Sequence, residues 1–238
     1  MLDKNKILSD AKIWFKESFA KSHITNTIKL VNPSELKINH FTAVYLANFL
    51  TGNSSPESIA KALLYPRVLG TSVTTIFGTG IQKFTNDVLG TFGSTTKGID
   101  IEFVDQLDGH RKYCQLKSGP NTINNDDVET IAGHFSGAIR LSNTNNLRIA
   151  HEDLIVGVIY GKPDDLSNFY KKITKEYHYP VFIGKKFWHR LTGDPSFYDD
   201  LLCAIGSVAV EADFSNEFEE VIKTLAATEE IISISNHE

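Results

Sequence analysis

The chain has 238 residues, of which 41% are hydrophobic and 22% charged, as in an ordinary globular protein of one sizeable domain with at most a smaller appendage. No apolar run approaches the roughly 20 residues that cross a bilayer, and the charged N-terminal stretch lacks a signal-peptide core. The net charge of −5 excludes an indiscriminate nucleic-acid coat, but not a DNA enzyme that concentrates positive charge in one cleft. Cys114 and Cys203 predict free buried thiols in the cytoplasm rather than a disulfide.

Helical patterns dominate residues 1–65. The stretch "HFTAVYLANFL" (residues 40–50) predicts a buried helix, which ends at the turn residues 51–55. The segment Ser55-Pro56-Glu57 is typical of the cap and first turn of a following helix. We therefore predict a helical N-terminal extension over residues 1–65. Its aromatic residues make it our candidate for a dimer contact.

Residues 70–80 resemble a loop, and residues 81–89 predict a helix that is closed by Gly90. Gly78 and Gly80 precede this helix and are candidates for bringing backbone N–H groups to a phosphate. A pair of glycines at this spacing more often only turns the chain.

Strand and helix patterns alternate in the rest of the chain. Asp108-Gly109 indicates a hairpin, and residues 124–127 supply capping side chains for a helix that ends near residue 141. "DLIVGVIYG" (residues 153–161) is typical of a strand covered on both faces. "YPVFIG" predicts a shorter strand, and helical patterns follow it. The predicted fold class is α/β, an α+β mixed sheet flanked by helices.

The hairpin "GIDIEFVDQLDGHRKYCQLKSG" (residues 98–119) carries polar residues on one face. Because alternate residues of a strand share a face, Asp100 lies beside Glu102, and Gln115 beside Lys117. In ordinary register Asp100, Gln115 and Lys117 converge, with Glu102 nearby. The alternative is a wet face with a surface ion pair between Asp100 and Lys117, on which Gln115 and Glu102 are merely solvated.

This group has the chemistry for metal-assisted phosphodiester hydrolysis. Mg²⁺ keeps several waters and needs only one or two carboxylates together with substrate phosphate. Asp100 offers an anionic oxygen, Gln115 an amide oxygen, and Leu116 a backbone carbonyl. Lys117 places an ammonium where it can orient water and offset charge that develops on the phosphate.

The segments "GIDIEF" and "YCQLKSG" resemble the PD-(D/E)xK nuclease superfamily motif in its Asp…Gln-x-Lys variant. The resemblance implies that Asp100 binds metal, that Gln115 takes the middle position and that Lys117 is catalytic. Gly98-Ile99 replaces the nominal proline before the Asp, and Gln115 replaces the commoner acid. Glu102 is a candidate to restore that missing charge. The position to compare with a helical Glu of some members is Gln82, which is also uncharged.

Four further blocks, "YPRVLG", "LKSGPNTIN", "IVGVIYG" and "GKKFWHRLTG", occur in the order seen in type II restriction endonucleases that cut interrupted GG-N-CC palindromes. This resemblance spans roughly residues 64–213 and assigns residues 66–238 to a nuclease catalytic domain. It implies a Mg²⁺-dependent homodimer that cuts both strands of double-stranded DNA at a short palindrome and leaves 5′-phosphate ends. Two-fold symmetry of the DNA is the physical reason for a dimer.

Five polar residues are candidates for contacts with DNA phosphates: Ser118, Asn121, Asn124, Lys185 and Lys186. Turn and capping chemistry is the alternative for the first three, and a charged helix face around Phe187 and Trp188 is the alternative for the two lysines. Two other functions stay open. One is a DNA-binding protein of nuclease fold that has lost cleavage, and the other is a less specific nuclease, such as a repair enzyme.

Overall fold

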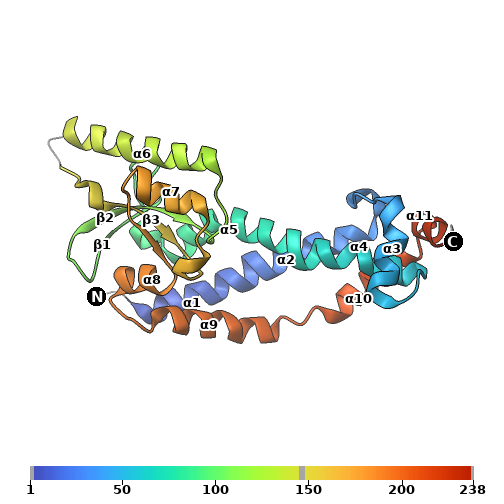
Figure 1. Ribbon diagram of the computed structural model, residues 1–238. Coiled ribbons are helices and arrows are strands. Elements are labelled where there is room, and N and C mark those ends of the chain that lie inside the picture. Colours follow the sequence, from blue (N-terminus) through green and yellow to red (C-terminus); the bar gives the residue numbers. More distant parts are fainter. Residues whose placement is uncertain (1–2, 145–147, 237–238) are drawn as a thin grey trace. The chain divides into compact units, whose positions relative to one another are not determined.

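The computed structural model describes residues 3–144 and 148–236, and its elements are labelled in Figure 1. Packing divides the chain into two compact units, neither of which is a continuous segment. The first, here called the sheet unit, comprises Met1–Trp14 and Gly78–Ser207. The second, here called the helical unit, comprises Phe15–Phe77 and Val208–Glu238. The expected division at residue 65, by function rather than by packing, stays a prediction.

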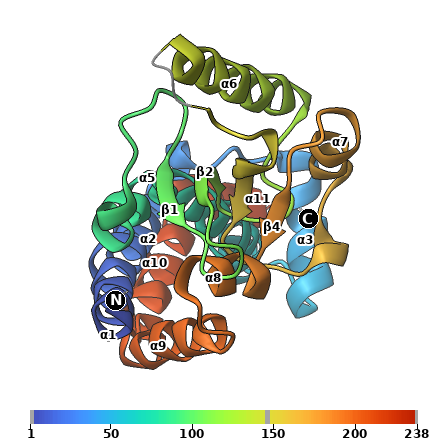
Figure 2. The same ribbon diagram turned by 90° about the vertical axis from the view of Figure 1, so that its left-hand side faces the viewer.

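A four-stranded mixed sheet in the order β1-β2-β3-β4 forms the centre of the sheet unit, which confirms the predicted fold class. Strands β1 (Ile101–Val104) and β2 (Arg111–Lys117) are antiparallel. Strands β3 (Leu154–Val158) and β4 (Val181–Ile183) continue parallel to β2. Helices α6 (Asn125–Thr144) and α7 (Asn168–Glu176) are the crossovers, and both lie on one side of the sheet (Figure 2). The parallel strands require such long connections.

The core between the sheet and its crossover helices is mostly aliphatic, with a few aromatic rings among the branched side chains. Val156 and Val158 of β3 face this side, and the fully buried Phe135 of α6 packs there with Tyr179. Every residue of β3 is buried, as its continuous apolar sequence predicts for a strand that is covered on both faces.

The opposite face of the sheet carries a chain of aromatic rings. Phe103 of β1 meets Phe187 of α8 (Lys185–Thr192), and Trp188 stacks on Phe197 of α9 (Phe197–Glu211). Phe84 of α5 (Val73–Val88) lies between Trp188 and Trp14 of α1 (Lys4–Trp14). Edge-to-face pairs of this kind stabilise a core beyond the area they bury.

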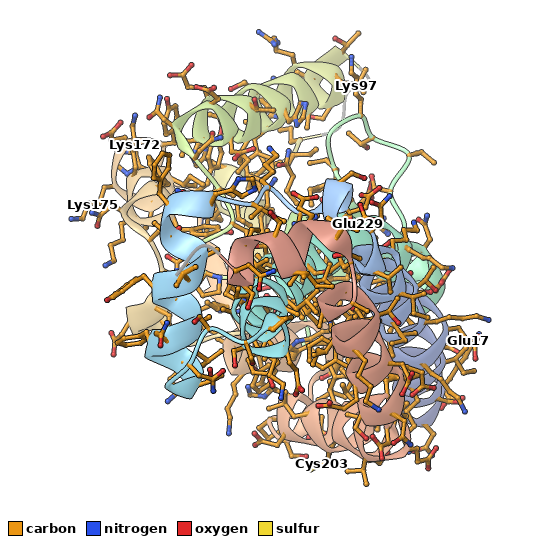
Figure 3. All side chains as sticks on the ribbon, turned by 90° about the vertical axis from the view of Figure 1, so that its right-hand side faces the viewer. Glu17, Lys97, Lys172, Lys175, Cys203 and Glu229 are labelled. Atoms are coloured by element: carbon orange, nitrogen blue, oxygen red, sulfur yellow. The ribbon has the colours of Figure 1, made fainter. Side chains whose placement is uncertain are left out.

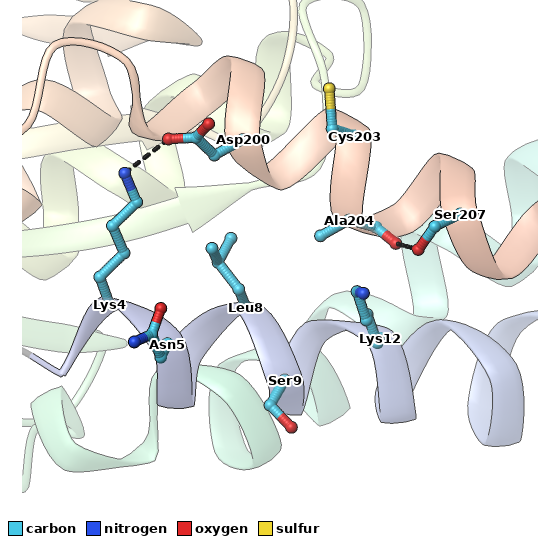
Figure 4. A pocket seen from close by; sticks show the side chains of 9 residues that line it. All are labelled: Lys4, Asn5, Leu8, Ser9, Lys12, Asp200, Cys203, Ala204 and Ser207. Atoms are coloured by element: carbon cyan, nitrogen blue, oxygen red, sulfur yellow. Dashed lines mark hydrogen bonds and ion pairs between the residues drawn. The ribbon is translucent and has the colours of Figure 1, made fainter.

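Helix α1 is therefore part of the sheet unit. Lys4 binds both Asp194 and Asp200, at 2.5 Å each, and a groove of about 560 Å³ separates α1 from α9 (Figure 4). Cys203 lines this groove and is exposed, so the expectation of two buried thiols is wrong for this residue; Cys114 is buried, and both thiols are free.

The helical unit contains α2 (Lys21–Ile28), α3 (His40–Thr51), α4 (Pro56–Pro66), α10 (Ser215–Ala226) and α11 (Glu229–Ser235). The predicted cap at Ser55 is confirmed, because its side chain accepts a hydrogen bond from the Ser58 N–H. Gly52, at φ +79°, ends α3 in the left-handed conformation. Helix α3 buries only Ala43 and Ala47, so the prediction of a buried helix is wrong for its larger side chains.

The prediction of a loop at residues 70–80 is also wrong. A π-helical segment, Arg67–Ser72, continues α4, and α5 begins at Val73. Gly78 and Gly80 lie inside α5, where backbone N–H groups are used by the helix itself and do not form a phosphate cradle. No helix among the described residues is both long and apolar enough to cross a membrane.

Candidate active site

The β1–β2 hairpin has the alternation that the sequence predicts. Ile101 pairs with Cys114 and Phe103 with Lys112. Gln115 pairs with Val156 of β3, and Lys117 with Val158. Because cross-strand neighbours share a face, Gln115 and Lys117 lie on the side of the sheet that α6 covers.

Asp100 directly precedes β1 and is fixed to β2. Its carboxylate accepts a hydrogen bond of 2.7 Å from the Leu116 backbone N–H. Burial raises the pKa of Asp100 above its usual value, and the Leu116 N–H, the Lys117 ammonium and the neighbouring His134 side chain only partly offset this effect. The carboxylate is thus held half-buried, close to Lys117, with one oxygen committed to the backbone.

Gln115 is almost fully buried, and its amide nitrogen lies between two acceptors. The nitrogen donates to the Gly98 carbonyl at 2.6 Å and lies 2.8 Å from Nδ1 of His134 in α6. A carbonyl only accepts hydrogen bonds, so the amide nitrogen must be the atom that faces Gly98. Oε1 is therefore the atom that remains for a metal ion.

Gly98 is the residue that permits this approach. It has φ +80°, and a Cβ at this position would lie 2.4 Å from Cγ of His134. Only glycine combines that backbone conformation with so close a neighbour.

The backbone of Leu116 points towards Asp100. Lys117 O accepts from Ile159 N on the β3 side, whereas Leu116 N donates to Asp100 on the other side. Since the N–H and C=O of one strand residue point the same way, the Leu116 carbonyl lies on the Asp100 side. The Lys117 ammonium, in contrast, forms no hydrogen bond or ion pair with the described residues, and among them it acts on Asp100 only through its charge.

Glu102, whose role as a site residue stays a prediction, has several partners within the protein. Its carboxylate accepts hydrogen bonds from Ser94 at 2.6 Å and Thr96 at 3.3 Å, and it pairs with Arg111 at 3.3 Å. These contacts place Glu102 at the outer edge of the sheet and tie down the turn at residues 94–96. The side chain of Gln82, in α5, lies outside the described part of the structure.

The candidate DNA contacts have different surroundings. Ser118 is buried, Asn121 is exposed, and Asn124 forms a reciprocal cap with Asp127, in which each side chain accepts from the other backbone N–H. Lys185 and Lys186 are exposed and line a cavity of about 690 Å³ at the carboxyl ends of β3 and β4. Lys185 pairs with Asp199, and the Lys186 ammonium lies 5.1 Å from the centre of the Phe182 ring.

The donor set fits a hard cation that keeps much of its water. The described residues contain no group of three or more His, Cys, Asp or Glu side chains that could hold a metal ion. One carboxylate, one amide oxygen and one carbonyl are instead a set that suits Mg²⁺ with substrate oxygens and waters. Sequence reasoning missed Gly98 and His134 as site residues. The signal for His134 is a polar residue on the buried stripe of α6, between Ile131 and Ala138.

The match to a known family agrees with this geometry. A search of curated proteins finds no match to the chain. The sequence model of the type II restriction endonuclease EcoO109I family matches residues 36–213, which is more than half of the 238 residues and includes the whole hairpin, α6 and β4. The chain therefore belongs to the type II restriction endonuclease EcoO109I family and is a site-specific deoxyribonuclease.

Proposed function

We propose that the protein cuts both strands of double-stranded DNA at a short palindrome with the help of Mg²⁺ and leaves 5′-phosphate ends. Enzymes of this type generally use divalent metal ions. The observation that supports the proposal is the hydrogen bond from Leu116 to Asp100, which brings the carboxylate beside Gln115 and Lys117. The three residues then act as a PD-(D/E)xK-type site, in which an amide replaces the second acid. The DNA substrate is also our reason to place the protein in the cytoplasm.

Asp100, Gln115 and the Leu116 carbonyl are the proposed metal ligands. The ion supplies a Lewis acid that polarises the phosphate and lowers the pKa of a bound water. Asp100 contributes the negative charge, and its bond to Leu116 fixes the direction of its free oxygen. Gln115 adds a neutral oxygen, which keeps the net charge of the site low when an anionic phosphate enters.

Lys117 is the proposed catalytic lysine. It follows Gln115 by two residues on the same face of β2, so its ammonium stands next to the ligands. A cation held there stabilises the negative charge that develops on the phosphate and orients the water. Because no described residue pairs with Lys117, substrate binding does not have to break an ion pair first.

Ser118, Asn121, Asn124, Lys185 and Lys186 are the proposed phosphate contacts. Strands β2, β3 and β4 are parallel, so Lys117 and the cavity beside Lys185 lie along the same carboxyl edge of the sheet. That edge is the usual ligand site of open α/β sheets. Exposed lysines there fix the position of a duplex without reading its sequence.

A second copy of the chain is the proposed partner, and α3 is the proposed contact. Phe41, Tyr45 and Phe49 recur every four residues and are 99%, 64% and 79% exposed. Aromatic side chains of this size leave on the order of 500 Å² of apolar surface in water. A stable interface buries about 800 Å² on each partner, so this stripe with neighbouring Leu46 and Leu50 supplies much of it. An exposed apolar patch of this size on a helix is normally covered by a partner.

The test is cleavage of a mixed-sequence plasmid with Mg²⁺ and with EDTA. Discrete fragments that disappear with EDTA support the proposal, a smear supports a less specific nuclease, and intact but shifted DNA supports binding alone. Asp100→Ala and Lys117→Ala should each stop cutting, whereas Lys175→Ala should not. Lys175 projects into solvent from α7 and serves as the matched control (Figure 3). Near-normal cutting by Lys117→Ala would exclude this site.

A further inference from the structure

The amide of Gln115 is oriented from two sides. Its nitrogen donates to Gly98 O at 2.6 Å and lies 2.8 Å from Nδ1 of His134. The Gly98 carbonyl can only accept, so the Gln115 atom that faces it is the amide nitrogen. One hydrogen of this nitrogen is donated to Gly98, and the other is left for Nδ1 of His134. Nδ1 then acts as the acceptor, and the hydrogen of the neutral ring is on Nε2.

His134 is itself firmly held. It projects from α6, a helix of 20 residues that buries Val128, Ile131 and Phe135 against the sheet. The imidazole also packs directly on Gly98, where even a Cβ atom would lie 2.4 Å from Cγ. Side chains mounted in this way lose little additional freedom when they accept a hydrogen bond.

We propose that His134 is a positioning residue, which holds the Gln115 amide with its oxygen towards the divalent ion. This inference rests on the proposed function of Gln115 as a metal ligand. It also gives a physical reason for an amide at this position. A carboxylate has no hydrogen to donate, so at position 115 it would face the Gly98 carbonyl unpaired, and it would turn His134 from acceptor to donor.

Leucine and asparagine at position 134 separate orientation from packing. The two side chains have nearly the same shape, but only the Oδ1 of asparagine can accept from Gln115 at the place of Nδ1. We expect His134→Leu to weaken metal binding about 10-fold or more, the usual cost of losing the partner of a metal ligand. His134→Asn should stay within about 3-fold of the wild type, which corresponds to less than about 1 kcal/mol.

The readout is direct binding of Mn²⁺ to the full-length protein, measured by the EPR signal of the free ion, with no cleavage required. Cutting at saturating Mg²⁺ is measured in parallel and should recover in His134→Leu, because orientation changes the affinity for the ion more than the chemical step. Gln115→Glu should bind Mn²⁺ no more tightly than the wild type, despite its added charge. Tighter binding by that variant would contradict the requirement for an amide.

Several outcomes would overturn the inference. Equal Mn²⁺ affinities of His134→Leu and the wild type would show that His134 does not orient Gln115. Equal losses of Mn²⁺ affinity in His134→Leu and His134→Asn would show that His134 contributes only through packing. If His134→Leu does not fold, His134→Ala removes the acceptor without adding atoms against Gly98. Cutting by Lys117→Ala would refute the proposed function, whereas an inactive Lys117→Ala with unchanged His134 variants refutes only the positioning role.

Discussion

The Asp100 carboxylate accepts a 2.7 Å hydrogen bond from the Leu116 backbone N–H. The bond joins residues on the two arms of the hairpin. It holds a charge that burial disfavours, since burial raises the pKa of Asp100. The carboxylate is therefore prepared for a cation at some cost to the stability of the free protein.

The first prediction concerns this cost. Asp100→Asn keeps an acceptor for the Leu116 N–H and removes the charge. It should therefore raise the melting temperature of the metal-free protein at pH 8 by about 2 °C. For a chain of this size, that shift corresponds to roughly 0.5–1 kcal/mol in the free energy of unfolding. A raised pKa in the folded state means that ionisation destabilises the fold as the pH rises through that pKa. The gain should therefore shrink as the pH falls through the folded-state pKa and vanish near pH 3, below the ordinary pKa of 3.8 of an aspartate.

Thermal unfolding in a metal-free buffer at the two pH values measures this effect, and plasmid cutting by the same protein should fall at least about 100-fold. An equal or lower melting temperature of the variant at pH 8 would contradict the account. Asp213→Asn is a suitable control. Asp213 is exposed just before α10, and its pKa is lowered by hydrogen bonds from Ser215, so the same substitution there should not raise the melting temperature.

The second prediction concerns Glu102. If Glu102 were an acid of the metal site, Glu102→Gln would shift the Mg²⁺ titration of cutting. Its bonds to Ser94 and Thr96 and its pairing with Arg111 predict instead an unshifted titration and a loss of about 1 kcal/mol of stability. Cutting rates over a range of Mg²⁺ concentrations, together with urea unfolding, distinguish the two. A several-fold weaker dependence on Mg²⁺ would restore Glu102 to the metal site.

The third prediction compares two glycines. Gly98 and Gly109 have φ values of +80° and +75°, but only at Gly98 would a Cβ meet a neighbour, His134. Gly109→Ala should lose about 1 kcal/mol through backbone strain alone. Gly98→Ala should lose a further 1–3 kcal/mol, roughly, from overpacking, and should weaken cutting as His134 and Gln115 move. Equal losses in urea unfolding would show that the contact with His134 is easily relieved.

The fourth prediction concerns the exposed stripe of α3. A Phe41→Ser, Phe49→Ser double variant should sediment as a monomer at concentrations where the wild type is a dimer, because it removes the two most exposed aromatic side chains. Its plasmid products should shift from cuts in both strands to nicks. Val210→Ser, at an exposed apolar residue of α9, is the control. A wild-type protein that sediments as a monomer, or a double variant that stays dimeric, would exclude α3.

The sequence predicted most of the sheet unit, because its signals are local. The Asp108-Gly109 turn, the apolar β3 and the cap at Asn124 each depend on neighbours in the chain, and all three agree with the structure. The arrangement of Asp100, Gln115 and Lys117 followed from strand alternation and the hairpin turn.

Other features depend on residues far apart in the chain. The β-branched residues and glycines near Gly78 weaken helix propensity, yet α5 forms, and a Cβ at Gly80 would already lie in contact with the Trp14 ring, at 3.4 Å. Lys112, which follows the hairpin turn closely, is nevertheless buried, and Asp153, 41 residues further along the chain, binds its ammonium at 2.6 Å. The contact of His134 with Gln115 is likewise set by where the crossover helix crosses the sheet, which no local pattern specifies.

The sheet unit is assembled from the first 14 residues and from a later stretch that begins at Gly78. A fragment that starts at residue 66 would lack Trp14, whose ring packs at 4.9 Å from Phe84, and Lys4, which bridges Asp194 and Asp200. Grafting the cleavage machinery onto a foreign DNA-targeting module therefore calls for a rearranged gene that supplies both pieces, and simple excision of the downstream half would leave a hole in the aromatic layer.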